Sequence, residues 1–381
     1  MECILPVKQL KYAASLLSNI ANIKSSFFLP YILIEASANG VTMSSVSLEL
    51  SAKIKIEDVT VVKEGSVLVG ASSFNGFAVN LQDRSGDYGT EPVLLKKMKS
   101  GIELKTKTAY KNGDLVINKA RLEEIDQSTF PDFLSINESS LMQIDGLFLK
   151  ESIDKTSYAI STGDDSMEIL RGINMKSDGD SFIVTATNGR ELSRYSRHID
   201  LPVFDSTITS LISKNISKYI MPDKPVEFSF QSGKAFIRSG NLEMIGSLYM
   251  NDYPNVEGVL NTSGLKYFIV NKEVLIDAIR GCMPSADERT SRLNVYIKGG
   301  VLSLKAESSN ETISDGIKIY DFDGEFSFDC NGWYLYSALA KVEGDTVSVN
   351  FKDHVSPIIL RDYLEKPYSL TLLILPMRSI K

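Results

Sequence analysis

Prolines divide this chain at nearly equal intervals, and this regular spacing constrains its fold more than any other feature. Pro131, Pro254 and Pro376 each follow an aromatic residue or a leucine. The first two lie 123 positions apart (254 − 131), and the last two lie 122 apart (376 − 254). Lys150 and Lys272 begin similar segments that are also 122 positions apart (272 − 150). Two markers with the same spacing predict three copies of one module, with an insertion in the first copy.

Three modules in a chain of 381 residues would have about 120 residues each, which is a common domain size. We predict domains at residues 1–140, 141–262 and 263–381. Because 43% of the residues are hydrophobic, each domain can bury a core of its own. A tandem of similar domains is more typical of a scaffold than of an enzyme with one cleft.

Each module is predicted to contain two helices. Apolar residues at helical spacing indicate the first helix, and in the three modules they are Val7, Leu10, Ala14, Leu17 and Ala21, then Leu149, Ile153, Thr156 and Ile160, then Val274, Ala278 and Cys282. Shorter second helices are predicted at residues 73–79, 206–217 and 330–335. Asp205 or Ser206 is the expected N-cap of the middle one.

Alternation of apolar and polar residues predicts strands between these helices. Examples are residues 40–50, 115–118, 182–187, 227–230, 301–304 and 347–351. The pairs Asn112-Gly113, Asn188-Gly189 and Gly299-Gly300 indicate hairpin turns. The predicted fold class is therefore α+β, with two helices per module packed on largely antiparallel sheets.

Composition excludes several classes of protein. The net charge of −7 argues against a protein that coats nucleic acid through its overall charge. A local basic patch is still compatible with this net charge. Three widely spaced cysteines indicate neither a disulfide framework nor a zinc site, and they suit a reducing cytoplasm. No apolar run approaches the ~18 residues of a membrane span. The N-terminus lacks a signal-peptide pattern, so we expect a cytoplasmic protein without a membrane partner.

The sequence offers no convincing catalytic or metal site. His198 and His354 are the only histidines, which leaves little for a histidine-based triad or a metal centre. Ser152 and Lys155 match a Ser-x-x-Lys pattern that is short enough to arise by chance. The segment 321–324 resembles the start of a calcium loop without the remaining ligands, so a turn is the simpler interpretation. We therefore predict no cofactor and no metal.

Basic residues recur on the predicted helices. They are Lys8, Lys11, Lys150, Lys155, Lys214, Lys218, Lys272, Arg280 and Lys341. Any one of them, taken alone, is explained by a solvated helix face. Their repetition in all three modules instead favours one positive side of the assembly, which would attract phosphates without reading a base sequence.

Three motifs, in order along the chain, resemble segments of the bacterial DNA polymerase III sliding clamp, the beta subunit. They are Thr185 to Leu192, Gly246 to Pro254 and Leu373 to Arg378. These resemble the family's Ala-Thr-Asp-Gly-His-Arg-Leu hairpin, its Gly-x-(Tyr/Phe)-Pro-Asp segment and its apolar-apolar-x-Pro-Met/Val-Arg ending. The resemblance covers essentially the whole chain.

The resemblance implies a DNA clamp fold, in which two chains of three domains close head to tail into a ring. A domain of this size is roughly 35 Å wide, so six domains would leave a hole for a hydrated duplex. Such a ring is a non-catalytic processivity factor that encircles double-stranded DNA. Its implied partners are the polymerase III catalytic subunit, the clamp loader, and replication and repair proteins. Lys24 lies near the position where family members carry a basic loop residue.

The resemblance also implies an apolar pocket that receives short peptides from these partners. The matching positions are Leu170, Thr187, Gly189, Arg190, Leu192, Pro254, Val259, Leu373, Ile374, Leu375, Pro376, Met377 and Arg378. The chain departs from the family at Arg190 and Glu191, where the family usually has His-Arg, and this changes the charge at the pocket rim. The tail Ser379 to Lys381 extends beyond the usual final arginine.

A ring of two chains requires an interface between the first domain of one chain and the third domain of the other. We place it at Leu115 and Ile117 on a first-domain edge strand, and at Pro284 and Ser285 in the third domain. Two alternatives remain: a protein-interaction scaffold that keeps the fold without encircling DNA, and a hydrolase that uses Ser152 and Lys155.

Overall fold

The computed structural model describes residues 1–22, 30–82, 89–135, 138–163, 166–260, 263–363 and 366–378. The predicted DNA-facing Lys24 and the tail 379–381 lie outside these ranges. Across the described residues the same order of elements occurs three times: a strand, a helix, a group of strands, a second helix and three more strands. This repetition agrees with the spacing of the prolines.

In the first copy, Pro6 is the N-cap residue of the first helix. Its elements are β1 (Glu2–Leu5), α1 (Val7–Ala21), β2 (Tyr31–Ser37), β3 (Gly40–Ser45), β4 (Leu50–Ile56), β5 (Thr60–Lys63), β6 (Gly65–Gly70), α2 (Ala71–Val79), β7 (Val93–Met98), β8 (Gly101–Ala109) and β9 (Leu115–Glu123). All five apolar residues predicted for the α1 stripe are buried. β5 is an extra strand without a counterpart in the described parts of the other two copies.

The second copy corrects one helix boundary. Its elements are β10 (Met142–Asp145), α3 (Gly146–Thr156), β11 (Gly172–Ser177), β12 (Ser181–Thr187), β13 (Glu191–His198), β14 (Phe204–Thr209), α4 (Ser210–Tyr219), β15 (Pro225–Gln231), β16 (Lys234–Ser239) and β17 (Leu242–Tyr249). Residues 206–209 form the end of β14, so the prediction of Asp205 or Ser206 as an N-cap was wrong. The hydroxyl of Thr209 instead accepts a hydrogen bond from the amide of Ile212 (3.4 Å).

The third copy corrects one apolar stripe. Its elements are β18 (Lys266–Asn271), α5 (Lys272–Cys282), β19 (Arg292–Lys298), β20 (Val301–Glu307), β21 (Glu311–Tyr320), β22 (Glu325–Asn331), α6 (Gly332–Leu339), β23 (Thr346–Phe351), β24 (Ile358–Asp362) and β25 (Ser369–Ile374). Val274, predicted to be buried, is exposed, and α5 buries Leu275, Ile276 and Ile279 instead. The side-chain oxygen of Asn271 caps this helix, because it accepts a hydrogen bond from the amide of Val274 (3.0 Å).

The lysines that suggested the repeat are not structurally equivalent. Lys150 is the fifth residue of α3, whereas Lys272 is the first residue of α5. The spacing between these two lysines therefore does not relate equivalent positions of the structural repeat. The order of the helices and strands defines the repeat instead.

Residue contacts divide the chain into two compact units. Unit 1 contains residues 1–150 and 214–248, and unit 2 contains residues 151–213 and 249–381. Strand pairing explains this division, because β4 pairs with β17 inside unit 1 and β13 pairs with β25 inside unit 2. Sheets thus continue across both predicted domain boundaries. The three domains at residues 1–140, 141–262 and 263–381 stay a prediction.

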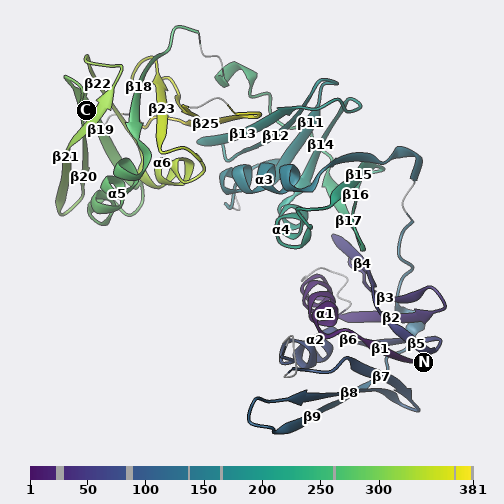
Figure 1. Cartoon of the computed structure of the whole chain (residues 1–381). Coiled ribbons are helices and arrows are strands. Elements are labelled where there is room, and N and C mark those ends of the chain that lie inside the picture. Colours follow the sequence, from purple (N-terminus) through teal and green to yellow (C-terminus); the bar gives the residue numbers. More distant parts are fainter. Residues whose placement is uncertain are drawn as a thin grey trace. The chain divides into compact units, whose positions relative to one another are not determined.

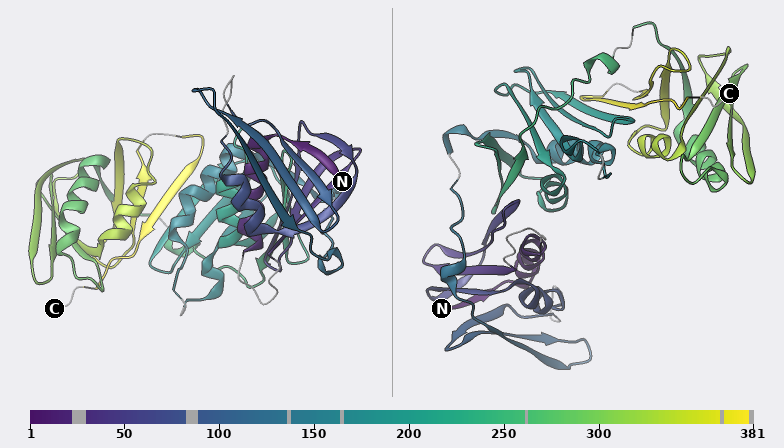
Figure 2. Two further views of the ribbon diagram at one scale, coloured as in Figure 1. Left: turned by 90° about the horizontal axis from the view of Figure 1, so that it is seen from below. Right: turned by 180° about the vertical axis from the view of Figure 1, so that it is seen from behind.

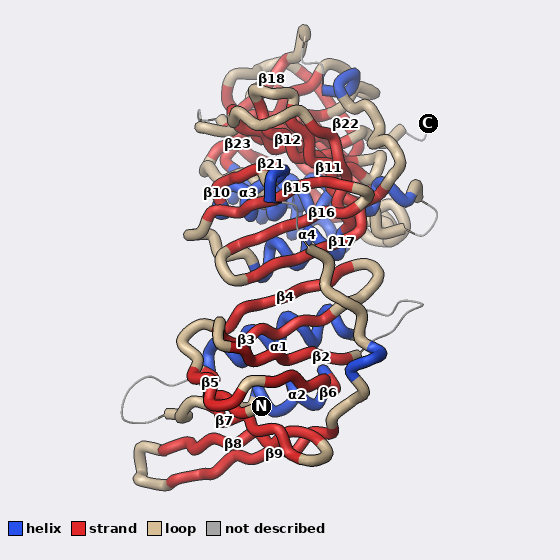
Figure 3. The backbone as a smooth tube through the Cα atoms, turned by 90° about the vertical axis from the view of Figure 1, so that its right-hand side faces the viewer, coloured by secondary structure: helices blue, strands red, loops and turns tan. Residues whose placement is uncertain are grey.

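Unit 1 contains two sheets. One runs in the order β10-β15-β16-β17-β4-β3-β2-β6, and its ladder is visible in Figure 3. The other is five-stranded, in the order β5-β1-β7-β8-β9, with β9 at its edge. α1 and α2 lie side by side in Figure 1, and α1 packs on β2, β3 and β4 through fully buried residues such as Leu10, Leu16 and Leu17.

Unit 2 repeats this plan. One sheet runs β14-β11-β12-β13-β25-β24-β23-β18, and the other runs β22-β19-β20-β21. Both views in Figure 2 show α5 and α6 next to each other, and α5 also packs on β20 and β21. All the described ladders are antiparallel, as the sequence predicts for an α+β fold.

Two glycines in the helices of unit 1 should respond in opposite ways to alanine. A Cβ on Gly146, at the start of α3, would lie 2.2 Å from the carbonyl oxygen of Lys224 and 2.7 Å from that of Met221. A Cβ on Gly76, inside α2, would meet nothing within 4 Å. We expect Gly146→Ala to lower the free energy of unfolding by about 1–3 kcal/mol through overpacking. Gly76→Ala should raise it by about 0.5–1 kcal/mol through helix propensity.

Urea unfolding followed by circular dichroism would measure both changes, and each variant controls for the other. Equal effects of the two substitutions would contradict the packing of α3 against the turn at residues 221–224.

Candidate functional site

A cavity of about 190 Å³ lies in unit 2 beside the junction of β13 and β25. Its lining residues are Leu170, Thr187, Gly189, Arg190, Glu191, Leu192, Pro254, Asn255, Val256, Val259, Leu373 and Leu375. They come from the turn before β11, the β12–β13 hairpin, the segment after β17 and the end of β25. We call this cavity the groove.

The base of the groove is a small hydrophobic cluster. Leu192 of β13 pairs in register with Leu373 of β25, and both pack with Ile359 of β24. Val256 and Leu260 pack against this cluster from the segment after β17. Val259 and Leu375 are partly exposed at the groove, so an apolar side chain of a ligand could bury itself against them.

The β12–β13 hairpin holds the polar end of the groove in one conformation. Gly189 has a φ of +83°, a backbone geometry that glycine adopts without strain. The side-chain oxygen of Asn188 accepts from the amides of Arg190 (2.9 Å) and Glu191 (3.0 Å). The amide of Leu375 donates to the carbonyl of Arg190 (2.8 Å), which ties the end of β25 to the turn. The groove is thus largely pre-formed.

The structure brings together most residues of the predicted pocket. Among the predicted members, Ile374, Pro376, Met377 and Arg378 do not line the cavity. Strand alternation explains why Ile374 does not line the cavity, because its side chain is buried on the opposite face of β25 from Leu373 and Leu375. Met377 instead donates its amide to the carbonyl of Asp329 (2.7 Å).

Sequence reasoning missed three lining residues. Asn255 and Val256 lie directly after Pro254, so the motif itself could have indicated them. Glu191 also lines the groove, although the resemblance marked it only as a change of charge at the rim. Only the fold shows that this carboxyl is buried.

Glu191 carries an unusual carboxyl group. Its side chain is 4% exposed, and Oε1 accepts from Nδ2 of Asn188 (2.9 Å). Burial raises the pKa of Glu191 to about 7, because the hydrogen bond from Asn188 offsets only part of the desolvation. Burial raises the pKa of Tyr158 as well, and the negative charge of Glu191 adds to that shift.

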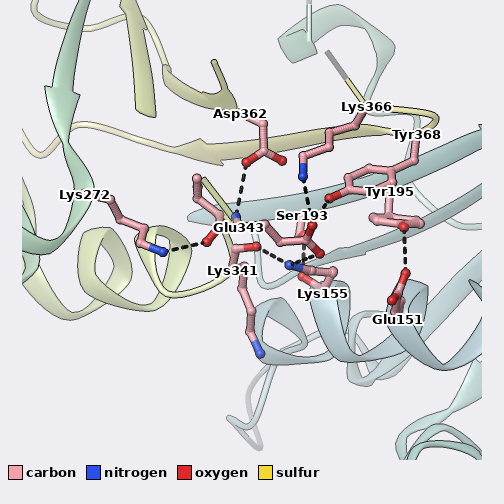
Figure 4. A network of polar contacts seen from close by, with 11 residues as sticks. Glu151, Lys155, Ser193, Tyr195, Lys272, Lys341, Glu343, Asp362, Lys366 and Tyr368 are labelled. Atoms are coloured by element: carbon pink, nitrogen blue, oxygen red, sulfur yellow. Dashed lines mark hydrogen bonds and ion pairs between the residues drawn. The ribbon is translucent and has the colours of Figure 1, made fainter. Parts of the chain in front are cut away.

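A polar network occupies the other face of β13, as Figure 4 shows. Lys155 of α3 lies 3.0 Å from Oε1 of Glu343 and donates to the carbonyl of Lys341 (2.6 Å). The hydroxyl of Ser193, on β13, donates to the carbonyl of Lys155 (2.8 Å). The network therefore links α3 and β13 to the segment after α6.

Two tyrosines extend this network toward β25. The rings of Tyr195 and Tyr368 stack with centroids 4.7 Å apart. The hydroxyl of Tyr368 donates to Oε2 of Glu343 (2.5 Å), and that of Tyr195 donates to Glu151 (3.4 Å). Lys366 contributes a further contact to Glu343 (3.4 Å). Four separate segments of unit 2 thus meet behind the strand that forms the groove.

The environment of Glu343 favours its charged form. Burial alone would raise its pKa, but hydrogen bonds from Tyr368 and Lys155 outweigh burial and lower the pKa to about 2. Glu343 is therefore ionised at neutral pH and is the anionic centre of the network.

The predicted DNA-facing residues fall into two groups. Lys8, Lys214, Lys218 and Arg280 are exposed on their helices. Arg280 also donates to the hydroxyl of Tyr336 (2.9 Å). Lys11, Lys150, Lys155 and Lys341 are partly buried. Lys341 follows α6 rather than lying on it, and burial lowers its pKa.

Lys11 and Lys150 of the second group, together with the partly buried Lys272, hold helices together. Lys11 on α1 donates to the carbonyl of Leu81, just after α2 (2.6 Å). Lys150 on α3 donates to the carbonyl of Ser217 in the last turn of α4. Lys272 on α5 donates to the carbonyl of Val342, just after α6 (3.2 Å). In every copy an ammonium group therefore caps the C-terminal end of the second helix, where a cation is favourable.

The other predicted features have simple structural explanations. Ser152 is completely buried within α3, and Lys155 is committed to Glu343. Among the residues that the structure describes, no group of three or more metal-ligating side chains is placed to hold an ion. In the same part of the chain, no helix is long and apolar enough to cross a membrane.

The predicted interface residues lie at or beside sheet edges. Leu115 and Ile117 are exposed on β9, the edge of the five-stranded sheet. Ser285 lies beside β21, because its hydroxyl is 2.6 Å from that of Thr312. Pro284 is exposed next to it.

Comparisons with known proteins agree with this fold. A family model for the C-terminal domain of the DNA polymerase III beta subunit matches residues 259–378. The beta sliding clamp of Staphylococcus epidermidis is 23% identical over 374 residues, which cover 91% of each chain. That of Streptococcus pneumoniae is 25% identical over 353 residues, which cover 87% of each chain. The chain is therefore similar to beta sliding clamps over most of its length, and residues 259–378 match the C-terminal domain of the DNA polymerase III beta subunit.

A solved structure supports the same fold for this chain over its full length. The crystal structure of the beta subunit from the DNA polymerase of Streptococcus pyogenes matches it with a TM-score of 0.87 at 19% identity, and 100% of both chains is covered. The predicted α+β clamp fold with antiparallel sheets is therefore confirmed.

The network around Glu343 should make the stability of unit 2 depend on pH. A carboxyl whose pKa is lowered on folding stabilises the protein above its unfolded value near 4.5, and this contribution is lost as the pH falls toward 2. We expect Glu343→Gln to lower the urea midpoint at pH 7 and to have progressively less effect at pH 4 and pH 3. Fluorescence of Trp333, the single tryptophan, on α6, reports this unfolding.

Glu307→Gln, which breaks an exposed pair with Lys305, is the matched control. A loss for Glu343→Gln that is as large at pH 3 as at pH 7 would contradict the charged network.

Glu191 should have the opposite dependence on pH. Its folded-state pKa of about 7 lies above the unfolded value near 4.5, so stability falls as the pH rises between these values. We expect Glu191→Gln to stabilise the protein by roughly 1–3 kcal/mol at pH 8 and to have little effect at pH 4.5. Urea unfolding at both pH values measures the difference.

Glu168→Gln, an exposed change from carboxyl to carboxamide in the same unit, is the control. An equal stabilisation by Glu191→Gln at the two pH values would contradict a destabilising effect of the buried, charged carboxylate.

Proposed function

We propose that two copies of this chain close into a ring around double-stranded DNA and act as a processivity factor for DNA polymerase III. The observation that carries the proposal is a pair of sheet edges, on β9 and β21, that have no partner strand in the described part of the chain. The equivalent strands of the other copies pair with each other inside the chain. The similarity to beta sliding clamps supports the same function.

The repeated order of elements identifies the two edges. β4, β13 and β21 are each the third strand after the first helix of a copy, and β9, β17 and β25 are each the last strand of a copy. β4 pairs with β17, and β13 pairs with β25. Within the described residues, β9 pairs only with β8, and residues 311–318 of β21 pair only with β20.

The free edges are suited to a third pairing of the same kind, between β9 of one chain and β21 of another. Both edges expose apolar side chains, among them Leu115 and Ile117 on β9 and Ile313 on β21. Unpaired strand edges with exposed apolar residues are favourable sites for strand addition. Two such contacts, related by a twofold axis, would close a ring of two chains.

Sequence-independent contact with DNA would then come from the exposed cations on the helices. Lys8, Lys214 and Lys218 are exposed and can approach phosphates, and Arg280 is exposed as well, although it contacts Tyr336 and Asp277. The ammonium groups of Lys11, Lys150 and Lys155 are instead engaged with carbonyl oxygens. A small number of weak phosphate contacts suits a ring that must slide.

We infer that the groove binds short linear peptides of the polymerase, the clamp loader, and replication and repair proteins. Its apolar base around Leu192 and Leu373 fits the apolar anchors of such peptides. We further infer a non-catalytic accessory role in the cytoplasm. The burial of Ser152 and the ion pair of Lys155 speak against the hydrolase alternative.

The test combines the mass in solution with retention on DNA. We expect a mass of two chains, retention on a nicked circular plasmid after loading by a clamp loader with ATP, and loss from the same plasmid once it is linearised. Ile313→Asp on β21 should give single chains at ~1 µM and no retention, because it places a charge on the proposed edge. Val203→Asp, on the exposed loop that precedes β14, is the control.

A single chain in the unmodified protein, or equal salt-sensitive binding to circular and linear DNA, would contradict encirclement. That result would favour an interaction scaffold that keeps the clamp fold without enclosing DNA.

A further inference from the structure

We propose that the outer face of the five-stranded sheet in unit 1 binds an acidic segment of a partner protein, in which carboxylates are interspersed with aliphatic side chains. This face consists of the side chains of β5, β1, β7, β8 and β9 that point away from the core, and we call it the basic face. It shares no residue with the groove.

Strand alternation collects cations on this face. Leu95 of β7 pairs in register with Leu104 of β8, and both are completely buried, so their neighbours along each strand point outward. β7, β8 and β9 lie next to one another in Figure 3. The basic face carries six exposed cations and three carboxylates, namely Lys63, Lys96, Lys105, Lys107, Lys119 and Arg121, and Glu2, Glu103 and Glu123. The face is therefore positive on a chain whose net charge is −7.

Two of the carboxylates are already engaged with cations of the same face. Glu103 contacts both Lys119 (2.8 Å) and Arg121 (3.2 Å). Glu2 contacts Lys96 (3.1 Å). These contacts use the carboxylates nearest the middle of the sheet and leave the remaining cations without an acidic neighbour.

The remaining cations at the middle of the face are Lys105 and Lys107 on β8. Their ammonium groups have no ion-pair or hydrogen-bond partner within the described residues. Lys105 also lies directly opposite Lys119 on β9. Like charges at directly opposite positions destabilise a sheet. An anionic group bound between them would remove this repulsion.

The equivalent position in the second copy is neutralised within the chain. Lys105 is the fifth residue of β8, and Arg238 is the fifth residue of β16, the corresponding strand. Arg238 lies between two carboxylates on its neighbouring strands, at 3.2 Å from Glu227 and 3.1 Å from Glu243. Lys105 instead lies between Leu94 and a second lysine. The fold therefore does not require unpaired cations at this position, and binding of an external anion explains them.

The composition of the face favours a polypeptide over nucleic acid. None of the five strands contains an aromatic residue, so the bases of a single strand would find nothing to stack on. The closely spaced phosphates of a duplex would meet Glu2 and Glu103 as well as the cations. Ile4 and Leu94, by contrast, pair on the same face and offer an apolar contact to aliphatic side chains. An acidic segment with apolar residues fits both features.

The test measures the binding of fluorescein-labelled probes to the full-length protein by fluorescence anisotropy. The acidic probe is a twelve-residue peptide with six aspartates interspersed with leucine and glycine, and its control carries asparagine in place of aspartate. The nucleic-acid probes are a twelve-nucleotide oligothymidine and a hairpin duplex. We expect the acidic peptide to bind at least about tenfold more tightly than its asparagine control, and to weaken about fivefold between ~50 and ~200 mM NaCl.

Variants with the same change in net charge locate the binding site. Lys105→Glu combined with Lys107→Glu should weaken binding of the acidic peptide at least about tenfold. Lys55→Glu combined with Lys224→Glu changes two exposed lysines elsewhere in unit 1, and should weaken it less than about twofold.

A second variant transfers the arrangement around Arg238 to the basic face. Leu94→Glu combined with Lys119→Glu places a carboxylate on each side of Lys105, and should also weaken binding of the acidic peptide at least about tenfold. The urea midpoint of this variant should stay the same or rise, because the repulsion between two lysines is removed. A loss of binding would then not be caused by unfolding.

Equal losses in the Lys105 and Lys107 double variant and in its charge-matched control would overturn the proposal, as would a dissociation constant for the acidic peptide above about 1 mM. A loss of oligothymidine or duplex binding in the Lys105 and Lys107 double variant that exceeded its loss of peptide binding would also overturn it, and would assign the face to nucleic acid. None of these measurements requires ring closure or the groove, so their failure would leave the proposed function unaffected.

Discussion

Strand pairing between successive copies of the module is the interaction on which the rest of this structure depends. β4 pairs with β17 and β13 pairs with β25, so each sheet spans a boundary that the sequence repeat predicts. Backbone hydrogen bonds and cross-strand side-chain contacts act together along these ladders. The groove exists because of the second pairing, which sets Leu192 directly opposite Leu373.

β13 connects the groove with the polar network of unit 2. Alternate residues of a strand point to opposite faces, so Leu192 lies at the groove while Ser193 and Tyr195 contribute to the network. The ion pair of Lys155 with Glu343 and the stacking of Tyr195 on Tyr368 hold this strand from behind. The rigidity of the groove therefore depends on contacts that a bound peptide would not touch.

Charge in this protein has two separate uses. Some lysines that look like DNA ligands in the sequence instead cap helix ends, as Lys11 does at Leu81 and Lys272 does at Val342. Exposed cations such as Lys214 and Lys218 remain free for phosphate contacts on a chain whose net charge is −7. The carboxyl of Glu191, by contrast, is buried, so little solvent screens its charge.

The sequence by itself determined the α+β class and the threefold order of elements, because periodicity and turn residues act over short stretches of chain. Most of the groove residues followed from the three motifs that resemble segments of sliding clamps. It identified five of the nine buried residues of α1 but misplaced the buried face of α5, where Val274 is exposed. Only the tertiary structure decided which strand edges pair, which lysines are engaged and that Glu191 is buried. These features depend on residues far apart in the chain, whose register and burial are set by packing rather than by local pattern.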